Sequence, residues 1–470
     1  MNQFPSQGQT GSASSVPANP LGTLPINQLL ARFAIPSIIA MLVSALYNIV
    51  DQFFIGRSVG MLGNAATNVA FPLTITCTAL SLMFGIGGAA NFNLSMGHGE
   101  REDAARYAGN AVFMLFFTGL ILCLGVRLFL KPLMIAFGAT AEVLDYSLVY
   151  TGITSLGFPF LILTTGGSNL IRADGSPRFS MVCTLTGALI NTILDPLFIF
   201  TFHMGMAGAA LATISSQLFS AILVILCLTR TQDMYKVEWR KIRIDGRMLQ
   251  RIIRIGIPAG MQSVMYNISN IIIQAGVNNL GTDNVTAWAT YGKVDGLYWM
   301  MINALGISVT TFVGQNYGAR RMDRVRKGAG ACMVIGVVLT AIVSTALYFW
   351  GYLFIELFTS DPQVQLISQS LIHFMVPTFI TYITIEILSG TLRGVGDAWM
   401  PLIITGVGVC LVRVIWIIFA LPHFNTILAA AFCYPMTWAL TSAAFAVYYY
   451  FFSSLKRVNL KKIFLKHQYK

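Results

Sequence analysis

Long apolar segments recur along this chain, and they constrain its fold more than any other feature. A helix that crosses a bilayer needs about 20 mostly apolar residues, and twelve such segments follow one another between Leu29 and Phe452. Only 10% of the residues are charged, against roughly a quarter in a soluble protein. The predicted spans are residues 29–56, 64–95, 105–130, 144–171, 178–201, 206–229, 251–280, 284–312, 326–351, 364–393, 399–421 and 427–452. We therefore expect an all-α membrane protein with twelve transmembrane helices.

The basic residues indicate how the chain crosses the membrane. Most of the 30 Lys and Arg residues lie before the first span, in the even-numbered loops or after the last span, and such segments stay in the cytoplasm. This distribution predicts cytoplasmic termini and accounts for the net charge of +12 without nucleic-acid binding. The seven cysteines fall singly in different spans, so neither disulfides nor a metal cluster is indicated.

An internal repeat divides the chain into two halves. One constant offset places Arg172 on Arg393 and Gly175 on Gly396, and it holds without a gap through loops and spans. Each half holds six spans, so both copies have the same orientation and a pseudo-twofold axis along the membrane normal should relate the two six-helix bundles. The predicted units are a flexible cytoplasmic tail at 1–25, a lobe at 26–229, a cytoplasmic linker at 230–250, a second lobe at 251–452 and a basic cytoplasmic tail at 453–470.

Ionisable residues within spans are costly and mark candidate functional sites. In the first half, Asp51 ends the first span, where it is either functional or a charge wetted at the outer membrane boundary. Asp195 lies in NTILDPLF, four residues after Asn191 and therefore on the same helix face. This amide and carboxylate could bind a proton or Na⁺, or they could form a structural contact between helices.

The second half offers candidates for a central cavity. Lys293 and Asp295 lie two residues apart in the eighth span, so they point to different sides of the helix. Either one of them faces the cavity, or both form structural pairs with other helices. Glu386 and Arg413 are candidates for an ion pair between neighbouring helices or for substrate contact. Aromatic and thioether side chains of the eighth span could line a wall for flat cations, although lipid contact and helix packing explain most such residues. These candidates are Tyr298, Trp299, Met300 and Met301.

Enzyme signatures are missing from the sequence. No GxxxxGK[ST] phosphate loop, HExxH or GxSxG motif occurs, so neither ATP hydrolysis nor another catalytic activity is indicated. The five His residues lack metal-ligand spacing. We expect no cofactor apart from a coupling ion.

Taken together, the motifs resemble those of the multidrug and toxic compound extrusion (MATE) transporters over nearly the whole chain. The matching segments are AIPS, VDQFFIG, MGHGEREDAARYAGNA, LIRADGSPRF, NTILDPLFIF and GMAGAALAT. The resemblance is to the bacterial branch with its cation-linked polar residues in the first half. It implies an antiporter of the bacterial inner membrane that exports organic, cationic and amphipathic drugs or toxic compounds in exchange for H⁺ or Na⁺. It implies membrane lipid as a partner, but no nucleic acid or obligate protein partner.

The resemblance also implies roles for individual residues. Asp51, Asn191 and Asp195 match cation-coupling residues and would hold Na⁺ if that is the ion, and Pro36 matches the proline at which the first helix bends. Further matches to the coupling cluster are Asn169, Thr213 and, more loosely, Tyr150. Trp416 occupies the position that corresponds to Asp195 in the second copy, so we expect coupling in the first lobe. Other branches use acids of the second half, but the motifs around Glu386 and Asp295 do not match those branches.

Two other functions remain open. A flippase for lipid-linked oligosaccharides or lipid precursors would share this architecture but would need more cavity cations for a pyrophosphate than Lys293 and Arg413 provide. A membrane-embedded enzyme would need a convergent set of catalytic groups, which the sequence does not show. Drug efflux in a susceptible host distinguishes the first alternative, and product formation in detergent distinguishes the second.

Overall fold

The computed structural model describes residues 25–230, 244–453 and 455, and within these ranges every regular element is a helix. The predicted tails and most of the predicted linker lie outside the described residues. The long helices of the first half are α2 (Ile26–Ser58), α3 (Met61–His98), α4 (Arg101–Leu128), α6 (Ala141–Thr154), α7 (Phe158–Ala173), α8 (Pro177–Pro196) and α9 (Gly205–Arg230). Its short elements are α5 (Leu130–Ala136), η1 (Ser155–Gly157) and the π-helical turn η2 (Leu197–Thr201).

The second half repeats this arrangement. Its long helices are α10 (Gly246–Asn278), α11 (Thr282–Gly318), α12 (Met322–Phe358), α13 (Pro362–Met375), α14 (Ile383–Gly394) and α18 (Ile427–Val447). Its shorter elements are η4 (Val376–Thr381), α15 (Trp399–Thr405), η5 (Gly406–Leu411), α16 (Val412–Ile415), η6 (Trp416–Ala420), α17 (Leu421–Phe424) and η7 (Tyr448–Phe452). Eleven helical segments of the described chain are long and apolar enough to span a membrane. The 33-residue α10 completes the twelve, and the predicted all-α fold is confirmed.

The repeat is visible where the fourth span of each half is interrupted. The 3₁₀ turn η1 begins at Ser155 and its counterpart η4 begins at Val376, which is the same offset that places Arg172 on Arg393. Pro159 follows the first break and Pro377 lies in the second. Because proline cannot donate a backbone hydrogen bond, both copies break the helix at corresponding depths. The short helix α5 was not predicted.

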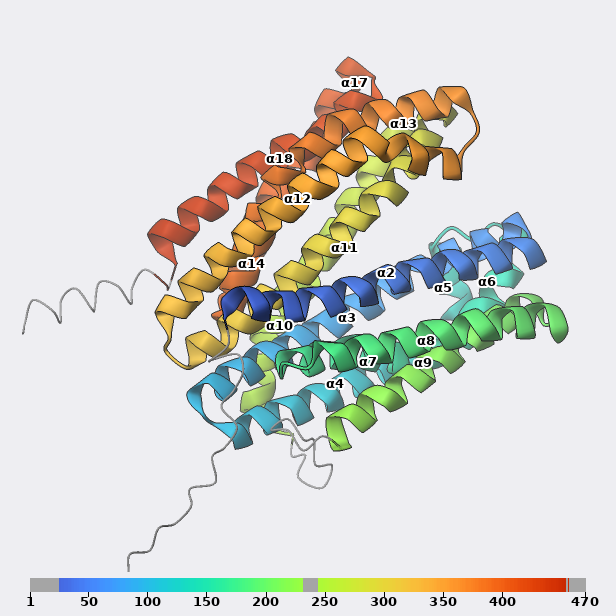
Figure 1. Ribbon diagram of the computed structural model, residues 1–470. Helices are drawn as coiled ribbons and strands as arrows, with labels where there is room; N and C mark the ends of the chain where they lie inside the picture. The colour runs from blue at the N-terminus through green and yellow to red at the C-terminus, as the bar shows by residue number, and fades with distance from the viewer. Residues whose placement is uncertain (1–24, 231–243, 454, 456–470) are drawn as a thin grey trace, which may run out of the picture.

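The two halves form two lobes that diverge towards one end. In Figure 1, α2–α9 (blue to green) form one bundle and α10–α18 (yellow-green to red) form the other. The bundles meet where α3 packs along α10 and α11, and they separate towards α5 and α6 on one side and α13 and α17 on the other. Each lobe has its own main apolar core, which Phe33 and Ala34 of α2 extend in the second lobe and Met248 and Ile252 of α10 extend in the first.

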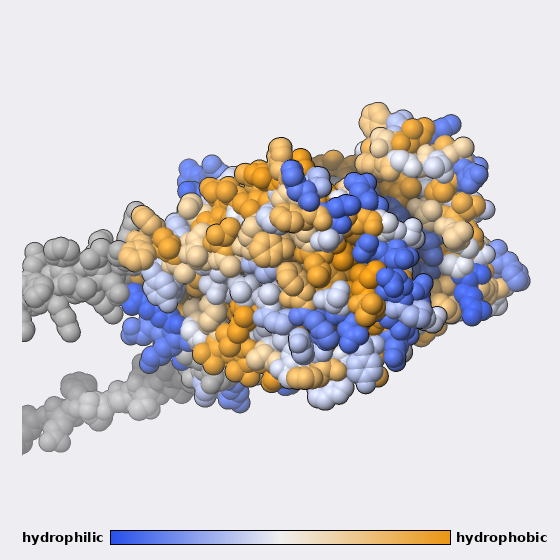
Figure 2. Space-filling model, turned by 90° about the horizontal axis from the view of Figure 1, so that it is seen from above, coloured by the Kyte–Doolittle hydropathy of each residue, from blue (hydrophilic) through white to orange (hydrophobic). Residues whose placement is uncertain are grey.

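Apolar side chains also cover much of the outer surface. Figure 2 shows broad hydrophobic areas on one face, interrupted by polar patches. Large apolar side chains that are more than half exposed include Leu46, Phe53, Ile121, Leu124, Ile342 and Leu440. In water such a surface would be unfavourable, but it suits contact with lipid hydrocarbon. The chain is therefore a multi-pass membrane protein.

Glycines allow the lobes to approach closely at the joined end. A Cβ atom at Gly87 of α3 would collide with the carbonyl oxygen of Ile252 in α10, and one at Gly256 would collide with the carbonyl oxygen of Met83. Small residues of this kind let helix backbones touch. Backbone packing between α3 and α10 therefore closes the space between the lobes at this end.

A glutamine adds hydrogen bonds across the same end. The Gln315 amide of α11 donates to Asn93 Oδ1 of α3 at 3.1 Å and to the carbonyl oxygen of Ala173 in α7 at 2.8 Å. Gln315 and Asn93 are both buried. One side chain of the second lobe thus holds two helices of the first.

Replacing Gly256 with Ala should destabilise the joined end. The new methyl group must displace backbone of α3, and overpacking of this kind costs about 1–3 kcal/mol. We expect Gly256→Ala to lower the melting temperature of the purified protein in detergent. Gly292→Ala is the matched control, because a Cβ there meets no atom within 4 Å; equal melting temperatures for the two variants would contradict the packing account.

Candidate functional site

A cavity of about 500 Å³ lies between the lobes. Most of its wall comes from α10, α11, α14 and α18, and the first lobe contributes Met41, Leu82, Ile86 and Asn169. Because both lobes line it, relative movement of the lobes would change its shape. The cavity therefore lies where alternating access can reach it.

Aromatic rings form much of the cavity wall. Trp299 of α11 lies edge-on to Tyr382, with ring centroids 4.5 Å apart, and 5.6 Å from Trp438 of α18. Tyr434 contacts Trp438 at 5.5 Å, and Tyr266 of α10 also lines the space. Aromatic faces attract organic cations through their quadrupoles. The wall thus suits a flat cationic molecule.

Two acids and two arginines share this cavity. Arg393 Nη2 lies 3.5 Å from Glu386 Oε1, and the Tyr382 hydroxyl donates to Glu386 Oε2 at 3.3 Å. Asp295 accepts a hydrogen bond from the Trp299 indole. With Arg413 as the second arginine, the formal charges of the side chains that line the cavity sum to zero.

The predicted pairing of Glu386 with Arg413 is wrong. Glu386 pairs with Arg393, seven residues further along α14. The Arg413 Nε donates to Thr437 Oγ1 at 3.1 Å, and its guanidinium carbon lies 4.0 Å from the centre of the Tyr434 ring. The rotation of each helix, which the sequence does not specify, decides these partners.

The eighth span directs its other candidates away from the cavity. Lys293 is exposed, with Nζ 4.7 Å from the centre of the Phe358 ring. Tyr298 is fully buried and donates to the Phe379 carbonyl at 3.0 Å. Met301 lies in the core of the second lobe, and Met300 is half-buried. Asp295 and Trp299 share one face because they are four residues apart, which explains why they, with Glu386, line the cavity.

In the first lobe, the structure brings together two acids predicted from the sequence. Asp51 of α2 is 7% exposed and Asp195 of α8 is 0% exposed, and their carboxyl groups lie within hydrogen-bonding reach of each other. The Asn191 amide donates to Asp195 Oδ1 at 3.3 Å. Tyr47 and Tyr150 lie close enough to interact with both acids.

This cluster has oxygen atoms to offer a cation. Asp51 Oδ1, Asp195 Oδ2 and Asn191 Oδ1 are buried and accept no hydrogen bond from the described residues. Buried polar atoms normally have partners, and hard cations prefer oxygen ligands. These three oxygen atoms could therefore bind a proton or coordinate Na⁺. Directly after Pro196, η2 forms a π-helical turn beside the cluster, and such turns are frequent at functional sites.

The other residues that the resemblance singled out have the following contacts. Asn169 borders the cavity between the lobes and accepts a hydrogen bond from Arg172 at 2.8 Å. Thr213 donates to the Ala209 carbonyl within α9 at 3.0 Å. Pro36 lies inside α2, which continues as one helix through it.

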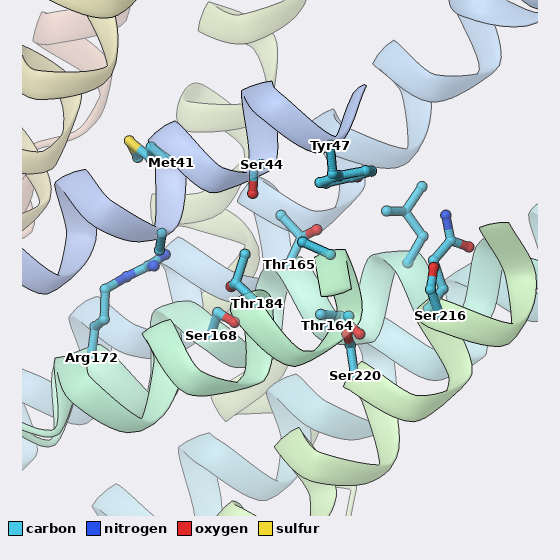
Figure 3. Close-up of a pocket in the computed structure, with 15 residues that line it drawn as sticks. Met41, Ser44, Tyr47, Thr164, Thr165, Ser168, Arg172, Thr184, Ser216 and Ser220 are labelled. Carbon is cyan, nitrogen blue, oxygen red and sulfur yellow. The ribbon is translucent and has the colours of Figure 1, made fainter. Parts of the chain in front are cut away.

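A second pocket, of about 230 Å³, lies within the first lobe. Figure 3 shows Ser44 and Tyr47 of α2 facing hydroxyl-bearing side chains of α7 and α9, with Arg172 at one end. Sequence reasoning noted Arg172 only as the repeat partner of Arg393 and did not single out Tyr47. A single arginine at the end of a predicted span was the feature of the sequence that could have indicated this pocket.

The family model MatE matches the chain twice, at residues 36–197 and 258–419. The chain belongs to the MatE family. The two matched ranges are displaced by nearly the same offset as the internal repeat, which agrees with the duplication. The chain is thus a MATE family transporter.

Two curated relatives are similar along most of this MATE chain. The probable multidrug resistance protein YoeA of Bacillus subtilis is 22% identical over 439 residues, covering 92% of this chain and 95% of the relative. The multidrug export protein MepA of Staphylococcus aureus (strain NCTC 8325) is 26% identical over 374 residues, covering 79% and 80%. These relatives are named as multidrug resistance and multidrug export proteins, and the family is one of transporters, so the prediction that the chain is not an enzyme is confirmed.

Solved structures share the fold. An outward-facing multidrug resistance MATE family transporter superposes with a TM-score of 0.88 at 19% identity, covering 94% of this chain and 99% of that one. A transporter of the MOP superfamily from Pyrococcus furiosus gives 0.85 at 19% identity, covering 92% and 97%. The arrangement of two helical lobes is therefore that of known MATE structures.

The ion pair in the cavity generates a prediction. Glu386→Gln leaves Arg393 without its charged partner, and Arg393→Gln does the converse, so each variant should be less stable than the wild type. The double variant should lose less than the sum, with a coupling energy of about 0.5–3 kcal/mol. Chemical denaturation in detergent measures the cycle. The exposed Glu356→Gln of α12 is the control; additive losses would show that the pair does not interact.

Proposed function

We propose that this MATE transporter exports organic, cationic and amphipathic compounds in exchange for H⁺ or Na⁺. The observation that carries this proposal is the separation of two different sites. A buried pair of acids lies within the first lobe, and an aromatic cavity lined by two acids and two arginines lies between the lobes. The naming of its relatives as multidrug resistance and multidrug export proteins supports the proposal.

The acid pair serves as the coupling site. Two carboxylates as close as those of Asp51 and Asp195 repel each other strongly in an apolar interior. One bound proton or Na⁺ removes this repulsion, and the free oxygen of Asn191 can add a ligand. The cluster therefore favours occupancy by a single monovalent cation.

The cavity between the lobes serves as the substrate site. The half-buried rings of Trp299, Tyr266 and Tyr434 line it, and Asp295 has a buried oxygen that accepts no hydrogen bond from the described residues. A pyrophosphate-bearing lipid would instead require surplus positive charge. The cavity has two acids for its two arginines and therefore no surplus positive charge, so export of organic cations is better supported than lipid-precursor flipping.

Helix α2 connects the two sites. It carries Asp51 near one end, and its Met41 lines the cavity between the lobes. A cation at Asp51 would alter the packing of α2 around Pro36 and weaken substrate binding. Coupling requires only that the cation and the substrate prefer different states of the same element.

The rocking of the lobes completes the cycle. The lobes are joined near Gly256 and diverge at the opposite end, which the distribution of basic residues assigns to the exterior. In this outward-open state the cation binds and the substrate leaves. The loaded carrier then rocks inward, releases the cation and accepts another substrate. Both termini are assigned to the cytoplasm and the protein to the bacterial plasma membrane.

Asp195→Asn should uncouple export from the gradient. The amide has nearly the same shape as the carboxyl group but cannot take up a proton or neutralise Na⁺. We expect efflux of a fluorescent organic cation from proteoliposomes to fall to the rate seen without a gradient. Asp145→Asn, an exposed acid of α6, is the control. Undiminished efflux by the Asp195 variant under imposed pH and Na⁺ gradients would refute the coupling role.

A further inference from the structure

We propose that a pocket of the second lobe, between α12, α14 and η7, binds the phosphate headgroup of an anionic phospholipid. This α12 pocket has a volume of about 430 Å³, which is within the roughly 300–1,000 Å³ of ordinary ligand pockets. No described residue lines both this pocket and the cavity between the lobes. The inference therefore does not depend on the substrate or on the coupling ion.

The α12 pocket lies at the joined end of the second lobe. Arg326 follows the start of α12 by four residues, which is about 6 Å along the helix axis. The π-helical turn η7 ends the last span, and Figure 1 shows the start of α12 and the end of α18 at the same end of this lobe. The distribution of basic residues assigns this end to the cytoplasm, so the pocket lies at the level of the headgroups of the cytoplasmic leaflet.

Arg326 supplies a positive charge to the pocket. Its side chain is half-buried, and its Nη2 donates to the carbonyl oxygen of Leu455 at 3.0 Å. It forms no ion pair with an acid of the described chain, and Asp323, three residues earlier on α12, is exposed. A guanidinium group has five N–H donors. Most of the hydrogen-bonding capacity of Arg326 is therefore available to an anion from outside the chain.

Two tyrosines add hydroxyl groups beside this charge. Tyr449 and Tyr450 of η7 line the pocket, and their rings meet edge-on with centroids 5.3 Å apart. Neither hydroxyl group forms a hydrogen bond with a residue that the structure describes, and Tyr450 is 68% exposed. Tyrosines at the edge of a bilayer lie at the level of the headgroups. Guanidinium and hydroxyl donors together match the oxygens of a phosphate group.

The surface of α12 next to the pocket suits acyl chains. Gly330, Val334 and Val338 follow Arg326 at intervals of four residues, which form one ridge on a helix. Gly330 is exposed, and Val334 and Val338 are 63% and 51% exposed. A Cβ atom at Gly330 would meet no atom within 4 Å, so helix packing does not require this glycine, and its lack of a side chain widens the pocket beside Arg326. A charge followed by an apolar ridge fits a lipid better than a free phosphate.

The internal repeat shows that the pocket is specific to the second lobe. The offset that places Arg393 on Arg172 places Arg326 on Ala105 of α4, which has no charge. It also places the exposed Gly330 on Gly109, which is buried. The duplicated fold therefore requires neither the charge nor the open space at this position, and a ligand accounts for both.

The tail of the chain is the alternative occupant of the pocket. Residues 456–470 follow Leu455 directly and lie outside the described residues. They include six Lys or Arg residues and no Asp or Glu. A segment of this composition provides no acidic side chain for Arg326, but it adds to the attraction of anionic lipid. The charges therefore favour a lipid headgroup over the tail.

Native mass spectrometry of the full chain tests the pocket. Delipidated protein in a neutral detergent is titrated with phosphatidylglycerol and, separately, with phosphatidylcholine, whose choline group neutralises the phosphate. The wild type should bind phosphatidylglycerol more tightly. Arg326→Gln removes the charge, and Gly330→Leu fills the pocket but keeps the charge. Each should lower the affinity for the first bound phosphatidylglycerol about tenfold or more, the effect of losing a hydrogen bond to a charged group.

Lys327→Gln is the matched control. It removes the same charge from the next residue of α12, which is exposed and does not line the pocket. The affinity of this variant for phosphatidylglycerol should stay close to that of the wild type. If Arg326→Gln fails to fold, Gly330→Leu still decides the inference, because it leaves every polar group of the pocket in place.

Several outcomes would overturn the inference. Equal losses in Arg326→Gln and Lys327→Gln would indicate unspecific attraction to surface charge, and unchanged binding by Gly330→Leu would place the lipid elsewhere. A wild type that binds both lipids equally would also contradict it. Displacement of phosphatidylglycerol by inorganic phosphate would assign the pocket to a free anion. A chain that ends at Leu455 and binds phosphatidylglycerol more tightly than the full chain would show that the tail occupies the pocket.

Discussion

The close contact between Asp51 and Asp195 is the interaction on which the proposed coupling of cation and substrate depends. Two buried carboxyl groups on different helices cannot both carry a charge at low cost in an apolar interior. We propose that their relative position depends on whether a cation is bound between them. Because α2 packs against α8 and contributes Ser44 to the pocket within the first lobe and Met41 to the cavity, a cation bound at the cluster would change the shape of both spaces.

Duplication produced the same scaffold twice but not the same chemistry. Trp416 stands where the second lobe would carry the counterpart of Asp195, and its indole donates to the Ala429 carbonyl at 2.8 Å. Conversely, Thr165 stands where the first lobe would carry the counterpart of Glu386. The two lobes thus differ at both acid positions, and their polar sites differ although the order of their spans is the same.

The sequence predicted the helices well because apolar runs and polar breaks determine where a chain can cross a membrane. It also indicated the cluster around Asp195, since an Asn four residues earlier must lie on the same helix face. It did not predict that Arg413 lies against Tyr434, or that Tyr298 packs in the core while Trp299 lines the cavity. These outcomes depend on how each helix rotates against its neighbours, which hydropathy does not record.

Reciprocal binding tests the central claim most directly. The affinity of the purified protein for a fluorescent organic cation is measured across a range of Na⁺ concentrations and, separately, of pH, and uptake or release of the ion is measured as the dye binds. Thermodynamic linkage requires both effects to have the same coupling factor. We expect that Na⁺ or H⁺ weakens dye binding, that the dye displaces the ion, and that replacing Asp51 with Asn removes both effects. A dye affinity that is independent of both ions in the wild type would contradict the proposed coupling.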